Sequence, residues 1–324
     1  MFEIWGPILA GLVALVVGGE LLVRGAVQTA ERIGISPLVI GLTLVGFGTS
    51  TPELVTSVQA GLSGSPGIAF GNVVGSNIAN ILLIAGVSAV IAPLVVARVA
   101  LRRDAMVMLV VAVVFAGVAP FAPMGRIAGV GLIAALVGYL GFVIHQERQH
   151  ADRGAIYDKT VALADADPGL APPHAPHGIL MPLLLAFAGL GLVVFGGSLL
   201  VGGAGSLARA FGVSETVIGL TIVAIGTSMP ELITSIVAAL KRQGEVAFGN
   251  VVGSNIYNIL GIGGTTALIA PSRVPEEIAR FDAPLMVLVS LLLVVFATTG
   301  LRITRWEGLA LIAGYGIYLW KLWP

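Results

Sequence analysis

Two nearly identical segments of the sequence each carry a carboxylate beside two hydroxyl groups. GTSTPELVTSV at 48–58 recurs as GTSMPELITSI at 226–236. In each copy a threonine, a serine and a glutamate stand at positions i, i+1 and i+4, so their oxygens can share one face of a helix. These side chains are Thr49, Ser50 and Glu53 in the first copy and Thr227, Ser228 and Glu231 in the second.

A second pair of segments adds amide and hydroxyl oxygens. AFGNVVGSNIANIL at 69–82 recurs as AFGNVVGSNIYNIL at 247–260, and both pairs of segments are separated by the same 178 positions. Each copy holds Asn, Ser and Asn at i, i+4 and i+8, which forms one stripe along a helix. The stripes are Asn72, Ser76 and Asn80 in the first copy and Asn250, Ser254 and Asn258 in the second.

These side chains together offer the chemistry of a site for a hard cation. All of them present oxygen, and none presents sulfur or imidazole. Carboxylate, amide and hydroxyl oxygens suit Ca²⁺, which takes about 6–8 oxygen ligands. Two carboxylates carry a charge of −2, which one Ca²⁺ or two Na⁺ would neutralise. The motifs therefore predict a site that can hold either ion in turn.

Each motif also has a simpler structural interpretation. Ser50-x-x-Glu53 and its copy match the capping box that begins a helix. The G-x-x-x-G within each second segment is a packing motif for closely spaced helices, which we favour for those glycines. The last asparagine of each stripe can hydrogen-bond between helices. Capping alone does not explain why the pattern occurs twice inside apolar segments, and capping and ion binding are compatible.

The composition places these motifs in a membrane. Of 324 residues, 57% are hydrophobic and 10% are charged, whereas roughly 25% are charged in a soluble domain. The mean hydropathy is +1.01. Because 17 basic residues balance 17 acidic ones, nothing electrostatic favours nucleic acid as a partner. The absence of cysteine from the sequence excludes disulfides and thiolate chemistry.

Apolar runs of the length needed to span a bilayer, about 20 residues, divide the chain into two halves. A polar stretch at 146–178 predicts a solvated connector between a first repeat at 1–145 and a second at 179–324. Because each half has five runs, an odd number, the second half enters the membrane inverted. The predicted fold is an all-α membrane protein of ten transmembrane helices in two inverted-topology five-helix repeats. The runs lie near 4–23, 36–62, 68–92, 104–122, 126–145, 179–201, 214–240, 246–270, 282–299 and 304–323.

Inverted repeats are typical of secondary transporters, whose binding sites lie near the membrane midplane on interrupted helices. Pro52 and Pro230 each lack an N–H group and clash with the preceding helical turn, so each predicts an interruption beside its glutamate. A charge at the midplane costs at least about 2.5–3.5 kcal/mol. Glu53 and Glu231, deep within predicted spans, are therefore functional candidates.

The basic residues predict the orientation. Lysine and arginine are enriched in cytoplasmic loops. Of the 17 in this chain, twelve fall on the side of the polar stretch and five on the other side. We therefore expect a multi-pass protein of the cell membrane, with the linker at 146–178 in the cytoplasm and both termini outside.

The paired motifs G-T-S-x-P-E and G-N-V-V-G-S-N resemble the two alpha-repeats of the sodium/calcium exchanger family, prokaryotic type, within the cation/calcium antiporter superfamily. The resemblance covers roughly 38–92 and 216–270. It implies a monomer in membrane lipid, whose predicted helices 2, 3, 7 and 8 form the ion core while helices 1 and 6 slide as a gate. It also implies Ca²⁺ and Na⁺ as the transported ions, without an organic cofactor.

The same resemblance implies a role for each matched residue. Glu53 and Glu231 would be the central ligands of calcium and sodium. Ser76 and Ser254 would bind the outer sodium ions. Further ligands would be the side chains of Thr49, Ser50, Thr227 and Ser228, the carbonyls of Gly46 and Ala224, and, at the middle of the site, Asn80 and Asn258.

One position departs from the family pattern. Many sodium/calcium exchangers, and the potassium-dependent branch, carry aspartate at the position of Asn258, whereas both halves of this chain carry asparagine. The core then holds two carboxylates. This argues against potassium dependence and leaves the sodium stoichiometry and the coupling ion open.

These observations predict a secondary antiporter, not an enzyme, that exchanges Ca²⁺ for Na⁺ by alternating access. A proton/Ca²⁺ antiporter with the same fold is the nearest alternative, with protonation of the two glutamates replacing sodium binding. A cation channel is an alternative of another class, although channel pores usually form from several subunits around an axis. For an intramembrane enzyme the sequence lacks H-E-x-x-H, G-x-S-x-G and cysteine.

Overall fold

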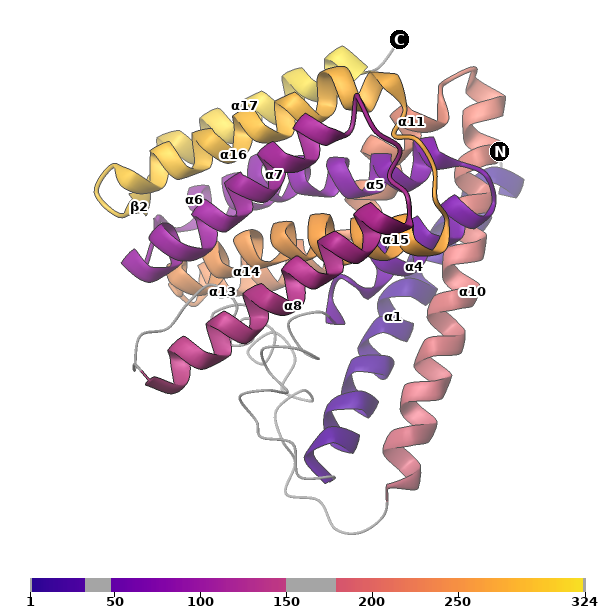
Figure 1. Cartoon of the computed structure of the whole chain (residues 1–324), viewed down its shortest axis with the longest axis horizontal. Helices are drawn as coiled ribbons and strands as arrows, with labels where there is room; N and C mark the ends of the chain where they lie inside the picture. Colours follow the sequence, from indigo (N-terminus) through magenta and orange to yellow (C-terminus); the bar gives the residue numbers. More distant parts are fainter. Residues whose placement is uncertain (1, 33–47, 150–178, 323–324) are drawn as a thin grey trace.

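The structure, a computed structural model, describes residues 2–32, 48–149 and 179–322. This part of the chain is helical apart from two short strands (Figure 1). The elements of the first half are α1 (Phe2–Arg32), α4 (Thr51–Leu62), α5 (Pro66–Ala79), η2 (Asn80–Ala85), α6 (Gly86–Ile91), β1 (Leu94–Val95), η3 (Ala100–Ala105), α7 (Met106–Val118) and α8 (Arg126–Gln149).

The elements of the second half are α10 (Leu180–Phe211), α11 (Glu215–Ile218), η5 (Gly219–Val223), α12 (Ala224–Thr227), α13 (Met229–Leu240), α14 (Gly244–Ile256), η6 (Tyr257–Gly263), α15 (Gly264–Ile269), η7 (Ile278–Asp282), α16 (Ala283–Thr298), β2 (Arg302–Ile303) and α17 (Arg305–Leu322). In the second half, the helices from α13 onward follow the same order as those from α4 onward in the first half, whereas its strand lies at a different place. The η segments are turns of π-helix within longer helices. Of the predicted linker at 146–178, residues 150–178 lie outside the described part of the chain.

Several helices are long and apolar enough to cross a membrane. Among the described residues five meet this condition, and a bent pair would be a sixth. Each lies on an apolar run that the sequence predicts to span the bilayer. A multi-pass helical membrane protein is therefore confirmed, while the total of ten spans stays a prediction. The five are Trp5–Ala26, Pro66–Ile91, Arg126–Gln146, Leu180–Phe211 and Ile278–Thr298, and the bent pair is Glu215–Thr227 with Met229–Leu240.

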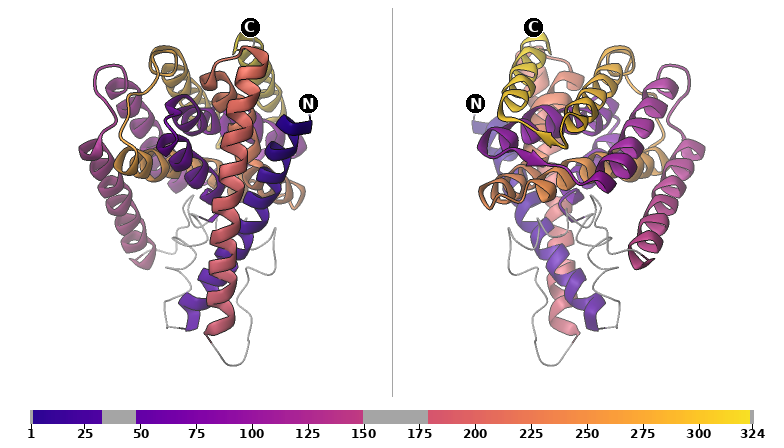
Figure 2. Two further views of the ribbon diagram at one scale, coloured as in Figure 1. Left: turned by 90° about the vertical axis from the view of Figure 1, so that its right-hand side faces the viewer. Right: turned by 90° about the vertical axis from the view of Figure 1, so that its left-hand side faces the viewer.

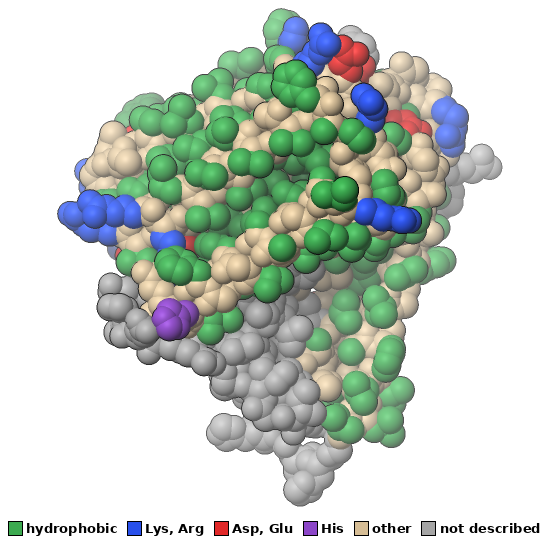
Figure 3. Space-filling view, in the orientation of Figure 1, with side chains coloured by type: hydrophobic (Ala, Val, Ile, Leu, Met, Phe, Trp, Pro, Cys, Tyr) green, Lys and Arg blue, Asp and Glu red, His purple; other side chains and the backbone are tan. Residues whose placement is uncertain are grey.

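The outer surface is rich in large apolar side chains (Figure 3). Ile127 on α8 is 91% exposed, Phe187 on α10 is 68% exposed and Trp306 on α17 is 81% exposed. A soluble monomer rarely exposes large apolar patches, because water would have to cover them. These surfaces suit contact with lipid chains.

Helices α1 and α10 lie side by side (Figures 1 and 2) and are antiparallel, since Gly11 faces Gly196 whereas Gly25 faces Ala186. A Cβ atom on Gly11 would lie 2.8 Å from the carbonyl oxygen of Gly196, and one on Gly189 would clash with the amide nitrogen of Leu22. The backbones approach this closely because glycine stands at the contact positions. The result is a closely packed pair of long helices.

The predicted interruption is present in the second repeat. Helix α12 ends at Thr227 and α13 begins at Met229, and the two axes are bent by 49°. Pro230 lies in the first turn of α13, where its missing N–H costs no hydrogen bond. In the first repeat α4 also has its proline, Pro52, in the first turn, and Ser50 adopts nearly the backbone angles of Ser228.

The helices that carry the asparagine stripes change their hydrogen-bonding pattern at the last asparagine. The π-helical turn η2 begins at Asn80, and η6 begins one residue before Asn258. Such turns widen a helix locally and occur frequently at functional sites. Both asparagines are only 1% exposed. The site helices are therefore irregular at the same depth in both repeats.

A buried aspartate–tyrosine hydrogen bond joins two helices in each repeat. Tyr139 of α8 donates to Asp104 of η3 at 2.8 Å, and Tyr318 of α17 donates to Asp282 of η7 at 2.9 Å. Asp104 also forms a salt bridge with the neighbouring Arg103 at 2.6 Å. These aspartates, 0% and 2% exposed, hold the outer helices together and are separate from the candidate ion site.

Candidate ion-binding site

The two glutamates lie at matched positions in the fold. Glu53 is in the first turn of α4 and Glu231 is in the first turn of α13, and each is 1% exposed. Helix N-termini present free N–H groups and a partial positive charge, which stabilise a nearby carboxylate. The helix starts at Thr51 and Met229 therefore make it possible to bury these two acids.

Serine hydroxyls connect the two glutamates across the repeats. Ser228 Oγ donates to Glu53 Oε1 at 2.9 Å, and Ser50 Oγ donates to Glu231 Oε1 at 3.2 Å. Each repeat thus supplies the serine for the carboxylate of the other repeat. Two motifs that are 178 positions apart in the sequence consequently form one site.

The first asparagine of each stripe fixes the turn that carries the glutamate. Asn72 Nδ2 donates to the backbone carbonyl of Glu53 at 3.1 Å, and Asn250 Nδ2 donates to that of Glu231 at 3.1 Å. The same amides donate to Ser57 Oγ at 2.9 Å and to Ser235 Oγ at 2.8 Å. The two serines were not predicted as site residues, although their presence in both copies of the first motif was a signal that could have identified them.

The stripe serines lie beside predicted ligands. Ser76 Oγ is 3.5 Å from the carbonyl oxygen of Ala224, and Ser254 Oγ is 3.5 Å from Glu231 Oε1. Gly46, whose carbonyl is a predicted ligand, lies outside the described residues. The structure therefore brings Ser76 close to Ala224 and Ser254 close to Glu231.

The last asparagines of the two stripes, Asn80 and Asn258, are both buried. Asn80 Nδ2 donates to Asn255 Oδ1 at 3.0 Å, so its amide group links α5–η2 to α14. Within the described residues, no hydrogen bond joins Asn80 or Asn258 to a glutamate. Both side-chain oxygens, Asn80 Oδ1 and Asn258 Oδ1, are buried without a hydrogen-bond partner in that part of the chain. Each of these oxygens can therefore still accept a hydrogen bond or bind a cation.

The two threonines of the motif, Thr227 and Thr49, differ in their hydrogen bonds. Thr227 Oγ1 donates to Asn72 Oδ1 at 3.0 Å. The equivalent pair, Thr49 of the first repeat and Asn250 of the second, forms no such bond, and Thr49 Oγ1 and Asn250 Oδ1 are both buried without a partner among the described residues. One half of the site is thus hydrogen-bonded internally and the other half is open.

The charge of the site is negative. Across residues 2–32, 48–149 and 179–322, Glu231 has no lysine, arginine or histidine partner, and its Oε2 atom accepts no hydrogen bond. A buried carboxylate is costly unless it is paired or coordinates a metal. No cluster of three or more His, Cys, Asp or Glu side chains occurs in the same residues. Two carboxylates with hydroxyl and amide oxygens favour an alkali or alkaline-earth cation over a transition metal.

Known proteins share both the sequence and the fold. The sequence model of the family described as "Sodium/calcium exchanger protein" matches residues 4–146 and 181–323. The chain is 34% identical to the sodium/calcium exchanger MaX1 of Methanosarcina acetivorans, with 96% of both chains covered. It is also 34% identical to the inner membrane protein YrbG of Escherichia coli, over 98% of this chain and 95% of that protein.

A solved structure of the sodium-calcium exchanger NCX_Mj, soaked with 10 mM Na⁺ and 10 mM Sr²⁺, superimposes with a TM-score of 0.63 at 33% identity. The alignment covers 100% of this chain and 99% of that one. Together with the duplicated motifs and the paired glutamates, these matches confirm the resemblance read from the sequence. The chain belongs to the sodium/calcium exchanger family of ion-transporting antiporters.

Proposed function

We propose that this protein is a secondary antiporter that exchanges Ca²⁺ for Na⁺ by alternating access. The observation that carries the proposal is the reciprocal pairing of Ser50 with Glu231 and of Ser228 with Glu53. It places two buried carboxylates in one site to which both repeats contribute. One Ca²⁺ or two Na⁺ would neutralise this charge of −2, so the two loads compete for the same oxygens.

The proposed ligands are those whose oxygens surround the carboxylates or lie open nearby. Glu53 and Glu231 act as the central ligands of both ions. The remaining ligands are Thr49, Ser50, Thr227, Ser228, Ser76, Ser254, Asn80 and Asn258, with the carbonyls of Gly46 and Ala224. The names of MaX1 and of NCX_Mj, the latter soaked with Na⁺ and Sr²⁺, support sodium and calcium as the transported ions, and no organic cofactor is required.

The α1–α10 pair is the proposed gate. The two helices contact the site helices of both repeats, since Leu12 of α1 packs on Gly226 of α12 and Gly197 of α10 packs on Val55 and Gln59 of α4. Gln59 Nε2 also donates to the carbonyl of Val194 at 2.7 Å. A sliding motion of the pair along α4 and α12 would open the site to one side of the membrane and then to the other.

Charge neutralisation is the proposed condition for this motion. An empty site that carries two carboxylates pays a large desolvation penalty when it is sealed from water. Either ion load removes that penalty, so only the loaded protein moves between its two open forms. This coupling makes the transporter an exchanger and prevents it from acting as a leak.

The proposed topology is ten transmembrane helices in two inverted five-helix repeats at 1–145 and 179–324. Two separate matches of the family model, one in each half, support the duplication. The distribution of lysine and arginine supports a cytoplasmic linker at 146–178 with both termini outside, in the cell membrane. The protein acts as a monomer, because both halves of the site come from one chain.

Calcium uptake into sodium-loaded proteoliposomes tests the exchange directly. After dilution into sodium-free buffer, uptake should require internal sodium. The Glu245→Gln variant, which changes an exposed glutamate on α14, should transport normally, whereas Glu231→Gln should not. Sodium-independent uptake would contradict sodium coupling.

A proton/Ca²⁺ antiporter is a second candidate that one observation favours. The middle of the site holds two neutral asparagines, Asn80 and Asn258, so protonation of Glu53 and Glu231 alone would make it neutral. Uptake driven by a pH gradient in sodium-free medium would favour this candidate. Flux far above the rates of carriers, or single-channel currents, would instead indicate a cation channel.

A further inference from the structure

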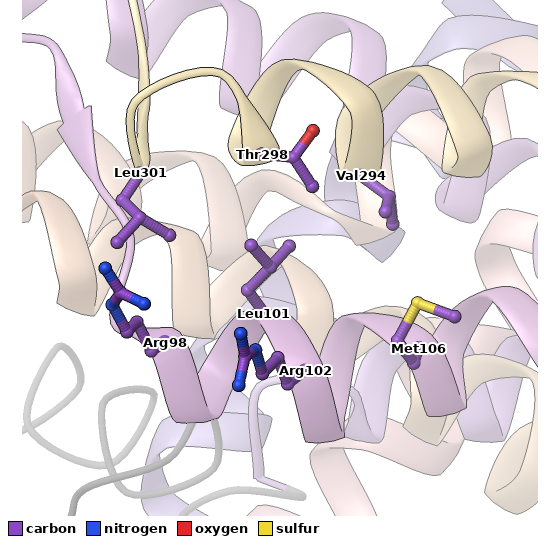
Figure 4. Close-up of a pocket in the computed structure, with 7 residues that line it drawn as sticks. All are labelled: Arg98, Leu101, Arg102, Met106, Val294, Thr298 and Leu301. Atoms are coloured by element: carbon purple, nitrogen blue, oxygen red, sulfur yellow. The ribbon is translucent and has the colours of Figure 1, made fainter.

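A pocket outside the ion site opens between η3–α7 and the end of α16 (Figure 4). Its volume is about 340 Å³. Arg98 and Arg102 extend into it from one wall, with Leu101 between them, and Val294 and Leu301 form the opposite wall. Both arginines are exposed, whereas Leu101 and Val294 are buried. The pocket therefore combines two cationic groups with an apolar surface.

None of the described residues neutralises the two arginines. Across residues 2–32, 48–149 and 179–322 neither guanidinium forms a salt bridge or a side-chain hydrogen bond. Their neighbour Arg103 differs, because it donates to Asp104 at 2.6 Å and to Gln146 at 2.6 Å. Like charges four residues apart on a helix repel each other. Arg98 and Arg102 thus leave positive charge available for a ligand.

The duplication supplies an internal comparison. A shift of 178 positions carries Arg98 to Glu276 and Arg102 to Arg280. These two residues line a pocket of about 470 Å³ beside Pro120, and they form a salt bridge of 2.9 Å. In the second repeat a carboxylate thus pairs with Arg280, the counterpart of Arg102, although Arg273 also lines that pocket. Among the described residues, the lining of the first-repeat pocket contains no acidic side chain to pair with Arg98 or Arg102.

The surroundings of the pocket identify the ligand class. The adjoining faces of α7 and α16 are apolar and exposed, with Val110 and Val114 on α7 and Leu291 and Val295 on α16. A guanidinium binds phosphate oxygens through two parallel N–H donors. Basic pockets between membrane helices on the cytoplasmic side bind anionic lipid head groups. By the distribution of lysine and arginine, this end of η3 faces the cytoplasm.

We propose that the pocket of Arg98 and Arg102 binds the head group of an anionic glycerophospholipid, with the acyl chains lying along α7 and α16. The phosphodiester would accept hydrogen bonds from both guanidinium groups. The apolar wall of Leu101, Val294 and Leu301 distinguishes a lipid from free phosphate, which would leave that wall in water. This proposal rests on the membrane position of the chain and not on the exchange reaction.

Native mass spectrometry of the purified full chain in detergent tests the proposal. The probes are short-chain phosphatidylglycerol, short-chain phosphatidylcholine and inorganic phosphate. The wild type should bind phosphatidylglycerol about tenfold more tightly than phosphatidylcholine, and millimolar phosphate should not displace the lipid. Arg98→Glu, which copies the Glu276–Arg280 pair of the other repeat, should lower phosphatidylglycerol binding about tenfold, and Arg102→Gln should act similarly.

Arg280→Gln is the matched control in the second repeat and should bind phosphatidylglycerol as the wild type does. Glu231→Gln should do the same, because the pocket is independent of the ion site. Unchanged phosphatidylglycerol binding by both Arg98→Glu and Arg102→Gln would overturn the proposal. Displacement of the lipid by millimolar phosphate would also overturn it, in favour of a site for free phosphate. A thermal melt of each variant separates loss of the site from loss of the fold.

Discussion

The hydroxyl of Ser228 donates to Oε1 of Glu53 at 2.9 Å, although the two residues are 175 positions apart. The converse bond, from Ser50 to Glu231, measures 3.2 Å. A single repeat cannot form either bond. The duplication therefore does more than produce two copies of a fold, because each copy completes the carboxylate environment of the other.

Loss of either serine hydroxyl should weaken ion binding. Hydrogen bonds to charged groups contribute about 1.5–3 kcal/mol, so Ser50→Ala and Ser228→Ala should each lower the apparent Ca²⁺ affinity roughly 10–100-fold. Isothermal titration of the purified protein with Ca²⁺ measures this. Ser206→Ala, which removes an exposed hydroxyl on α10 that bonds to the carbonyl of Gly202, is the control. Equal affinities in all three variants would contradict the proposed role.

The different states of Thr227 and Thr49 lead to a second prediction. Thr227→Val removes a hydrogen bond to Asn72 and should lower the thermal stability of the ion-free protein. Thr49→Val removes a hydroxyl that has no partner among the described residues. It should leave ion-free stability nearly unchanged and lower Ca²⁺ affinity. Melting curves with and without Ca²⁺ separate the two effects. A loss of ion-free stability in Thr49→Val but not in Thr227→Val would contradict the assignment of the open half-site.

Because the sequence has no cysteine, engineered disulfides can test the gate without competing disulfides from native cysteines. A Cβ on Gly226 would lie 3.4 Å from Cγ of Leu12, between α1 and α12. The controls are the single variants Leu12→Cys and Gly226→Cys, which cannot form this crosslink and should transport after the same oxidation.

Leu12→Cys with Gly226→Cys should lose transport after oxidation and regain it after reduction. The measurement is calcium uptake before and after treatment with dithiothreitol. If the oxidised Leu12–Gly226 crosslink permits full transport, α1 does not move relative to α12 and the gate proposal fails.

The aspartate–tyrosine pairs should contribute to stability rather than to ion binding. Tyr318→Phe leaves Asp282 without its hydroxyl donor and should destabilise the fold by about 1–3 kcal/mol. Tyr139→Phe should cost less, because Arg103 still pairs with Asp104. Tyr315→Phe is the control, since its hydroxyl has no hydrogen-bond partner in the described part of the chain. A Tyr315 variant as unstable as the Tyr318 variant would contradict the assignment.

The sequence was sufficient for the features that depend on local chemistry and on repetition. Pro230 predicts the break after Thr227 because proline cannot occupy a helix interior, and the break is present. The matched stripes predict that Ser76 and Ser254 face the site, and both lie near it. These inferences need only helical geometry and the physical chemistry of the residue types.

Contacts between helices could not be obtained in the same way. The bond from Asn80 to Asn255 depends on how α14 lies against η2, and no spacing along the chain encodes that crossing. The partners of Asp104 and Asp282 are tyrosines 35 and 36 positions further along. That separation spans a whole helix and a loop, and the repeat loses its strict alignment there. Packing, rather than periodicity, decides such pairs.

In the proposed mechanism, Glu53 and Glu231 form one ion site that carries the charge of both carboxylates. The most direct measurement is equilibrium Ca²⁺ binding to purified Glu231→Gln, with Glu245→Gln as the matched control and sodium as the competitor. We predict that the Glu231 variant loses high-affinity Ca²⁺ binding, while the control binds Ca²⁺ and releases it to sodium as the wild type does. Retention of wild-type Ca²⁺ affinity and sodium competition by the Glu231 variant would contradict the account.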